Sequence, residues 1–142
     1  MFISVTLVIT GDLLDPEEIT AILNVTPHVS RRKGGVRVYN SQKKIISKFG
    51  LWEWRSRDLS ETLTINDHVN RLKSTFEHAY GLLPSLPNAE NAWIDVHIVT
   101  GDKDEGITSV VFLMDTETIS TLRNIGLPVE FTIDDLPPKM SN

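Results

Sequence analysis

The stretch from Ile3 to Pro27, ISVTLVITGDLLDPEEITAILNVTP, constrains the fold of this chain more than any other part of the sequence. It begins with β-branched and other apolar residues that alternate with Ser4 and Thr6. This period of two predicts a strand over residues 3–9 whose odd-numbered side chains face a core. Gly11 then breaks the strand, and a turn follows.

The segment after the turn has the sequence features of a helix start. Asp15 can accept hydrogen bonds from the first free amides, and Pro16 suits the first helical position. The two glutamates that follow oppose the positive end of the helix dipole, and Glu18 can close a capping box onto Asp15. The apolar stripe of this helix is Ile19, Ile22 and Leu23, and the helix is expected to end near Asn24.

The rest of the chain predicts further strands and two more helices. Thr64 and Asp67 form a second capping box, and they open the longest helix, which runs to about residue 83. Asp115 caps a short helix with the stripe Ile119, Leu122 and Ile125, which ends at Gly126. Strands are expected over residues 36–39, 51–56, 93–100, 107–114 and 129–133, with residues 44–49 ambiguous between strand and helix. Residues 26–35 are interpreted as an exposed loop, and residues 101–106 as a hairpin-like turn.

This order, β-α-β-β-α-β-β-α-β, predicts an α+β fold. Several strands follow one another directly, so a mixed or mostly antiparallel sheet is expected, packed by one long and two short helices. Residues 110–131 echo the opening stretch, because an apolar segment again leads to an acidic cap, a short helix and a proline. The echo is compatible with a pseudo-repeat of two halves.

Length and composition bound the class of protein. The 142 residues suit a single domain, predicted over residues 1–134 with a C-terminal tail over 135–142. The chain has no cysteine, which excludes disulfides, a thiol nucleophile and thiolate metal sites, and is compatible with a reducing cytoplasm. No apolar run approaches the ~18 residues of a membrane span, and no signal peptide is visible, so a cytoplasmic protein without membrane contact is expected.

Charge is unevenly distributed along the chain. The formal net charge is −5, which argues against a general nucleic-acid binder. Nine of the 14 basic residues nevertheless lie between positions 31 and 57, including Arg31, Arg32, Arg55 and Arg57. A localised basic surface on an acidic body is therefore the main electrostatic indication of function.

Two groups of residues are candidate binding sites. Trp52 and Trp54 lie on one face of a predicted strand, which is typical of a core position. If that face were open, the two rings would form an aromatic platform beside the arginines, and Trp and Arg are enriched at binding hot spots. Asp95 and His97 share the outer face of another strand; they suit either a cross-strand surface pair or acid–base chemistry with a third group.

Two acidic segments resemble metal-binding sites at first sight. Among the carboxylates between Asp12 and Glu18, helix capping explains Asp15 and Glu18, and the cluster lacks the histidine and fixed spacing of a metal site. The loop from Asp102 to Gly106 has acids two apart but lacks the length and terminal glutamate of an EF-hand. No metal site and no cofactor are predicted.

The order of motifs resembles a known bacterial family. The segments ITGDLLDPEEITAILNVTP, GLWEWRS, INDHVNRLKSTF and ISTLRNIGLPVEF are similar to the family catalogued as domain of unknown function 4279. In that family a strand leads into a "dpeeIT..Lgi.Pt" segment, and a central "W...S" strand follows. This chain departs from the pattern at Asn24, where the family usually has glycine, but asparagine tolerates the left-handed conformation of a helix cap. The resemblance implies an α+β fold and transfers no activity and no catalytic residue.

Three functions are compatible with these observations. The leading prediction is a non-enzymatic module that binds another protein, such as an immunity protein whose acidic surface attracts a basic nuclease toxin. The alternative is a small-molecule-binding protein or an enzyme with a pocket near Asp95, His97 and the Trp52–Arg57 strand. A third is nucleic-acid binding through the basic segment 31–57. The sequence does not decide the oligomeric state.

Overall fold

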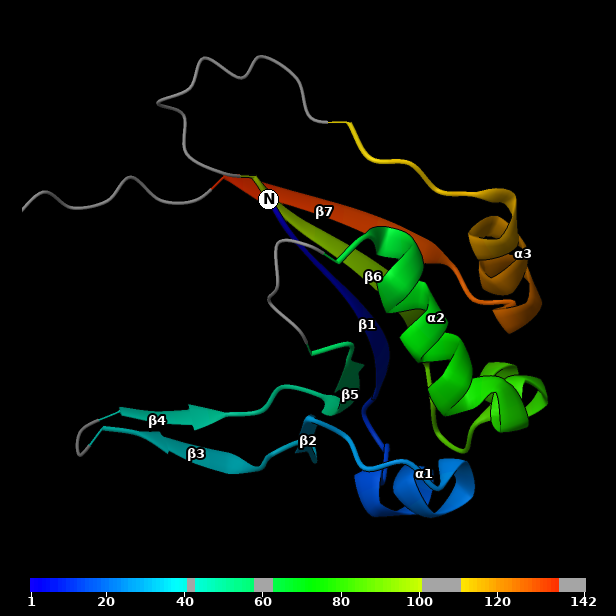
Figure 1. The fold of residues 1–142 in the computed structure, drawn as a ribbon. Helices are drawn as coiled ribbons and strands as arrows, with labels where there is room; N and C mark the ends of the chain where they lie inside the picture. The colour runs from blue at the N-terminus through cyan, green and yellow to red at the C-terminus, as the bar shows by residue number, and fades with distance from the viewer. Residues whose placement is uncertain (41–42, 58–62, 101–110, 136–142) are drawn as a thin grey trace, which may run out of the picture.

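The first strand of the chain, β1 (Phe2–Gly11), is the central strand of a five-stranded sheet with the order β2-β5-β1-β6-β7. This arrangement is seen in a computed structural model that describes residues 1–40, 43–57, 63–100 and 111–135 (Figure 1). The other strands of the sheet are β2 (Val29–Arg31), β5 (Gly50–Arg55), β6 (Asn91–Thr100) and β7 (Val129–Asp135). β1 is antiparallel to both of its neighbours, whereas β7 runs parallel to β6. The predicted α+β fold with a mixed sheet is confirmed.

Three α-helices accompany the sheet. They are α1 (Pro16–Leu23), α2 (Ile65–Phe76) and α3 (Thr116–Ile125), and α2 continues into the 3₁₀ helix η1 (Glu77–Ser85). α3 lies in the crossover from β6 to β7, which is why these two strands can run parallel. α2 and α3 pack against the same face of the sheet, and no helix of the described residues covers the opposite face, which we call the helix-free face (Figure 1).

The helix boundaries follow the capping signals in the sequence. Asp15 accepts hydrogen bonds from the amides of Glu17 and Glu18, and Asn24 closes α1 in the left-handed conformation with φ 53°. Thr64 and Asp67 form the predicted capping box of α2. Asp115 caps α3, and Gly126 ends it in the left-handed conformation with φ 74°. All of these boundaries were predicted from local residues alone.

The core lies between the sheet and the helices. The odd-numbered side chains of β1 face it as predicted, and they meet the apolar stripe of α2. Trp52 and Trp54 also face inward, where each ring lies edge-on against Phe76, with ring centroids 6.2 and 5.2 Å apart. The Trp52 indole Nε1 donates to the hydroxyl of Thr20, 3.0 Å away. This hydrogen bond satisfies the one polar atom of a fully buried side chain.

Several sequence expectations are wrong. β2 lies within residues 26–35, which were expected to be a loop, because Val29–Arg31 pairs with β5. Residues 111–114 form no strand. The similarity between residues 110–131 and the opening stretch therefore holds for the acidic cap, the helix and the proline, but not for the strand before the cap. Residues 101–110, with the expected turn and the Asp102–Gly106 loop, lie outside the described residues, as do 136–142 of the expected tail. Asp135, its first residue, belongs to β7.

The buried face of α3 also differs from the expected stripe. Leu122 and Ile125 are buried, but Ile119 is about half exposed. Thr118 and Thr121 take its place on the buried side. The Thr118 hydroxyl donates to the side-chain oxygen of Asn66 on α2, 2.6 Å away, and this bond fixes the rotation of α3 against α2.

A two-stranded ribbon extends away from the main sheet. β3 (Val36–Tyr39) and β4 (Lys43–Ile46) pair with each other in antiparallel fashion and with no strand of the main sheet (Figure 1). The first was predicted, and the second shows that residues 44–46 of the ambiguous segment 44–49 are a strand, whereas residues 47–49 are neither strand nor helix. We call these two strands the arm.

Candidate functional site

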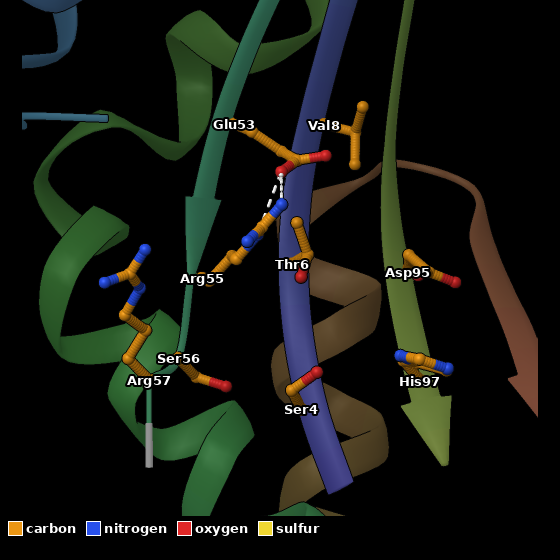
Figure 2. Close-up of a pocket in the computed structure, with 9 residues that line it drawn as sticks. All are labelled: Ser4, Thr6, Val8, Glu53, Arg55, Ser56, Arg57, Asp95 and His97. Carbon is orange, nitrogen blue, oxygen red and sulfur yellow. Dashed lines mark hydrogen bonds and ion pairs between the residues drawn. The ribbon is translucent and has the colours of Figure 1, made fainter. Parts of the chain in front are cut away.

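The helix-free face of the sheet carries a groove of about 700 Å³ (Figure 2). Its described lining includes Arg55, Arg57, Asp95 and His97, which are four of the eight residues that the sequence proposed for binding. Arg55 comes from β5, and Asp95 and His97 come from β6, on either side of β1. Arg57 follows the end of β5, and its guanidinium is directed to the side of that strand away from β1 (Figure 2). The sequence had grouped Asp95 and His97 with the Trp52–Arg57 strand as one candidate pocket, and the strand order adds that β1 lies between them.

The groove exists because residue size changes from strand to strand. β1 contributes small side chains to the floor, whereas its two neighbours contribute long polar ones to the walls. The strand register places these residues in two cross-strand rows, Glu53–Val8–Trp93 and Arg55–Thr6–Asp95, and it pairs Ser4 with His97. After β5 the Ser56 amide donates to the Val5 carbonyl at 2.9 Å, and the Arg57 amide donates back to the Arg55 carbonyl at 2.9 Å, so the chain turns at Ser56.

The polar side chains that line the groove contact neighbours on their own side of it. The Arg55 guanidinium donates to one carboxylate oxygen of Glu53 through Nε and through a terminal nitrogen, at 2.9 and 2.6 Å (Figure 2). On the opposite wall the His97 Nε2 lies 2.7 Å from a carboxylate oxygen of Asp134. The Thr132 hydroxyl donates to one carboxylate oxygen of Asp95, 2.9 Å away. These contacts orient the wall side chains before any ligand arrives.

The two tryptophans do not form part of the groove. Trp52 is fully buried, and Trp54 is buried beneath His28 with ring centroids 6.1 Å apart. Their face points to the helices, whereas Arg55 points to the opposite side of the same strand. The hypothesis that the two tryptophan rings form an open platform beside the arginines is therefore wrong. Both residues belong to the core, which was the alternative interpretation.

Arg31 and Arg32 also lie away from the groove. They line a separate hollow of about 520 Å³ at the base of the arm. The Arg32 guanidinium contacts the carboxylate of Asp15 at 2.7 Å, and Lys33 contacts Asp12 at 3.0 Å. These exposed ion pairs connect the base of the arm to the start of α1, and each contributes at most about 1 kcal/mol.

The arm exposes all of its described strand residues to solvent. One face carries Val36, Val38, Lys44 and Ile46, and the other carries Arg37, Tyr39, Lys43 and Ile45. Each face therefore combines apolar and basic side chains. The Arg37 guanidinium lies 6.0 Å from the Tyr39 ring centroid, a cation–π arrangement. Such a ribbon buries little of its own apolar surface, and two-stranded hairpins are marginally stable alone.

Ser56 and His68 form a buried pair that sequence reasoning missed. The Ser56 hydroxyl lies 2.8 Å from Nδ1 of His68 and accepts a hydrogen bond from the Val5 amide at 2.9 Å. Ser56 is only 1% exposed, and its oxygen is engaged by two partners. The geometry suits a structural tie between β1, the end of β5 and α2, rather than an activated nucleophile, which needs access to substrate.

The sequence contains signals for some of the groove and core residues that it did not lead us to propose. Ser4 and Thr6 alternate with apolar residues, so their outward position is readable, but their role as a groove floor needs the strand order. The Ser56 position belongs to the "W...S" pattern of the resembled family, and the structure gives that pattern a packing role. His28 accepts a hydrogen bond from the Arg55 amide at Nδ1, 2.9 Å away, and nothing in its loop context indicates this.

Electrostatics around His28 favour its neutral form. Partial burial lowers the pKa of this histidine most, the positive charges of Arg57 and Arg55 lower it further, and Glu53 opposes them. Among the described residues, no three histidine, aspartate or glutamate side chains converge so as to hold a metal ion. Within the described part of the chain, no helix is long and apolar enough to cross a lipid bilayer.

The sequence profile of the family described as domain of unknown function (DUF4279) matches residues 2–136. The chain belongs to the DUF4279 family. The match covers nearly the whole chain and confirms the resemblance seen in the sequence motifs. No curated protein and no solved structure matches the chain. The groove and the arm of this DUF4279 domain must therefore be interpreted from their own chemistry.

Proposed function

We propose that this DUF4279 protein is a non-enzymatic binding module, and that its arm docks onto another protein with an acidic surface. The single observation that carries the proposal is the exposure of apolar side chains on both faces of the arm. Exposed apolar clusters of this kind mark interaction surfaces on soluble domains. The arm gains a packed core only when a partner covers one of its faces.

Charge identifies the chemistry of the partner. Residues 31–48, which contain the arm and its base, carry seven lysines and arginines and no aspartate or glutamate. A partner that covers this segment must therefore offer carboxylates around an apolar centre. Such complementarity raises the association rate and suppresses binding of basic proteins. Lys44 and Arg37 lie beside the apolar residues on opposite faces of the arm, so either face can meet an acidic rim.

Binding by purified variants tests this proposal. The protein and three variants, Val38→Asp, Lys44→Glu and Arg123→Glu, are used as baits in an extract of the source cells. Arg123 is exposed on α3, so its variant makes the same charge change far from the arm. The expected partner is retained by the wild type and by R123E and lost by both arm variants. Its binding, remeasured with purified components, should weaken as salt concentration rises.

Three outcomes would overturn the proposal. The first is that no protein distinguishes the arm variants from R123E. The second is that sedimentation of the purified chain reveals a second copy as the only species bound through the arm. The third is that nuclease treatment of the extract abolishes the interaction, which would show that nucleic acid occupies the basic segment 31–57 instead.

A toxin-neutralising role is a second candidate for the same protein. Outside residues 31–48 the chain carries seven basic residues against all 19 acidic ones, a balance that favours a basic partner such as a nuclease toxin. In that case binding would use the acidic body, and Lys44→Glu would leave it unchanged. Inhibition of a toxin encoded beside this protein, measured with the same variants, distinguishes the two modes.

A further inference from the structure

The strand β7 forms one edge of the five-stranded sheet (Figure 1). Among the described residues, β6 is the only strand that pairs with it. β7 is seven residues long and contains no lysine and no proline, two residues that commonly protect an edge strand from further pairing. The strand at the other edge, β2, has only three residues. β7 is therefore the longer open edge of this sheet.

Alternate residues of β7 turn their backbone groups to the open side. The Ile94 amide donates to the Pro128 carbonyl at 2.9 Å, and the register pairs Ile94 with Val129. In a parallel ladder, a residue paired in this way is bonded to the two neighbours of its partner, so the amide and carbonyl of the partner itself point away. Val129, Phe131 and Ile133 therefore present their amides and carbonyls to the open edge.

Apolar side chains line one side of this edge. Phe131 lies on the face that packs against the helices, because it pairs with the buried Val96 of β6, and Ile133 follows on the same face. The Phe112 ring stacks on Phe131 with ring centroids 5.8 Å apart. Phe131 and Ile133 nevertheless remain 42% and 57% exposed. Apolar surface is therefore left uncovered directly beside unpaired backbone groups.

The helix-free face of β7 is acidic. Glu130 and Asp134 lie on it, and both are exposed. The register places Glu130 beside Asp95 of β6. Within the described part of the chain, no lysine or arginine forms a salt bridge with any of these three carboxylates. A further strand beside β7 would extend this face, so basic side chains on that strand would meet carboxylates at short range.

We propose that the open edge of β7 binds an extended segment of another protein in which basic and apolar residues alternate. The segment pairs with the outward backbone groups and adds a sixth strand to the sheet, a recurring mode of peptide recognition. Its apolar side chains cover Phe131 and Ile133, and its lysines or arginines lie beside Glu130 and Asp134. A second copy of β7 does not suit this edge, because pairing of the two strands would bring their carboxylates together.

Titration of the full-length protein with synthetic peptides tests this inference. The probe is a blocked heptapeptide with the sequence Lys-Val-Lys-Val-Lys-Val-Lys. One control replaces every lysine by glutamate, and a second carries a methyl group on every backbone amide of the probe. Amide hydrogen exchange reports the site, since the outward amides of Val129, Phe131 and Ile133 should gain protection. Saturable protection is expected with the probe and with neither control.

Two variants connect binding to the backbone and to the charge of β7. Ile133→Pro removes one outward amide and leaves the ladder with β6 intact, whereas Ile133→Val keeps the amide and is its control. Glu130→Lys reverses one charge, and its control is Glu18→Lys on α1, at the other side of the sheet. I133P and E130K should each weaken binding of the probe by about 3–10-fold, and both controls should bind it like the wild type.

Three results would overturn the proposal. Either control peptide binds as tightly as the probe, or I133P and E130K bind the probe like the wild type. The third is that the outward amides become protected as the protein concentration rises without peptide, which would place a second copy of the chain at this edge. The arm variant Lys44→Glu should retain peptide binding, because the arm and β7 are separate surfaces. Failure of the β7 site and failure of the arm proposal are therefore distinguishable.

Discussion

The hydroxyl of Ser56 lies 2.8 Å from Nδ1 of His68, in the interior between the end of β5 and α2. The same hydroxyl accepts a hydrogen bond from the Val5 amide of the central strand. One small side chain thus joins three elements that are distant in sequence, and it does so where water has no access, since Ser56 is buried.

Ser56→Ala should destabilise the protein by about 1–3 kcal/mol, because it leaves the buried Val5 amide without an acceptor. The measurement is urea unfolding followed by tryptophan fluorescence, which reports on the buried Trp52 and Trp54. Ser74→Ala is the control, since the exposed Ser74 hydroxyl donates only to the Asn70 carbonyl within α2. Equal unfolding midpoints for the two variants would contradict the role assigned to Ser56.

Thr20→Val should cost about 1–3 kcal/mol, because the Trp52 indole nitrogen would then be buried without a partner. Trp52→Phe removes that donor, so adding Thr20→Val to W52F should cost much less than it does in the wild type. A double-mutant cycle of unfolding free energies measures this coupling. Additive effects of the two substitutions would contradict it.

Acid stability should depend on Asp67. The amide and the hydroxyl of Thr64 donate to its carboxylate and lower its pKa below the ordinary value. The ionised form is therefore favoured by folding, and its contribution is present above about pH 4, the ordinary aspartate range, and is lost as the pH falls through the lower folded pKa. Asp67→Asn should flatten this part of the stability profile, measured by thermal melts across acidic pH. An unchanged slope would refute the capping box as its source.

His28 should make the protein less stable at mildly acidic pH. Partial burial and the nearby arginines lower its pKa in the folded state, so the unfolded chain binds the proton more readily. The stabilising contribution is complete above about pH 6.5 and falls as the pH drops through and below that value. His28→Asn keeps an acceptor for the Arg55 amide but does not titrate. Its melting temperature should fall less than that of the wild type between neutral and mildly acidic pH, and NMR titration should give His28 a pKa below the ordinary range.

Local signals in the sequence predicted the helices well and the short strands poorly. Asp15, Thr64 and Asp115 cap helices through their own neighbours, so a short window contains the whole interaction. β2 exists only because three residues pair with β5, a contact that no local pattern records. The apolar residues 111–114 form no strand, and their pattern alone could not reveal this.

The candidate site was predicted in pieces. Period-two alternation placed Asp95 and His97 on an outer face, and it placed Arg55 on the face opposite Trp54. It could not show that β1 separates them, because strand order is a property of the whole sheet. The rotation of α3 was missed for a related reason, since the bond from Thr118 to Asn66 is polar and does not appear in an apolar stripe.

The central position of β1 also sets the order in which this fold can be assembled. Both of its partner strands follow it by dozens of residues, so its two edges stay unpaired until β5 and β6 have been synthesised, and its apolar face stays uncovered until α2 has been. The sheet forms by closing long loops, and such long-range pairing slows folding relative to domains that are built from local contacts. A nascent chain that has reached only α1 therefore exposes an aggregation-prone strand, and chaperone dependence during synthesis should end once β6 is available.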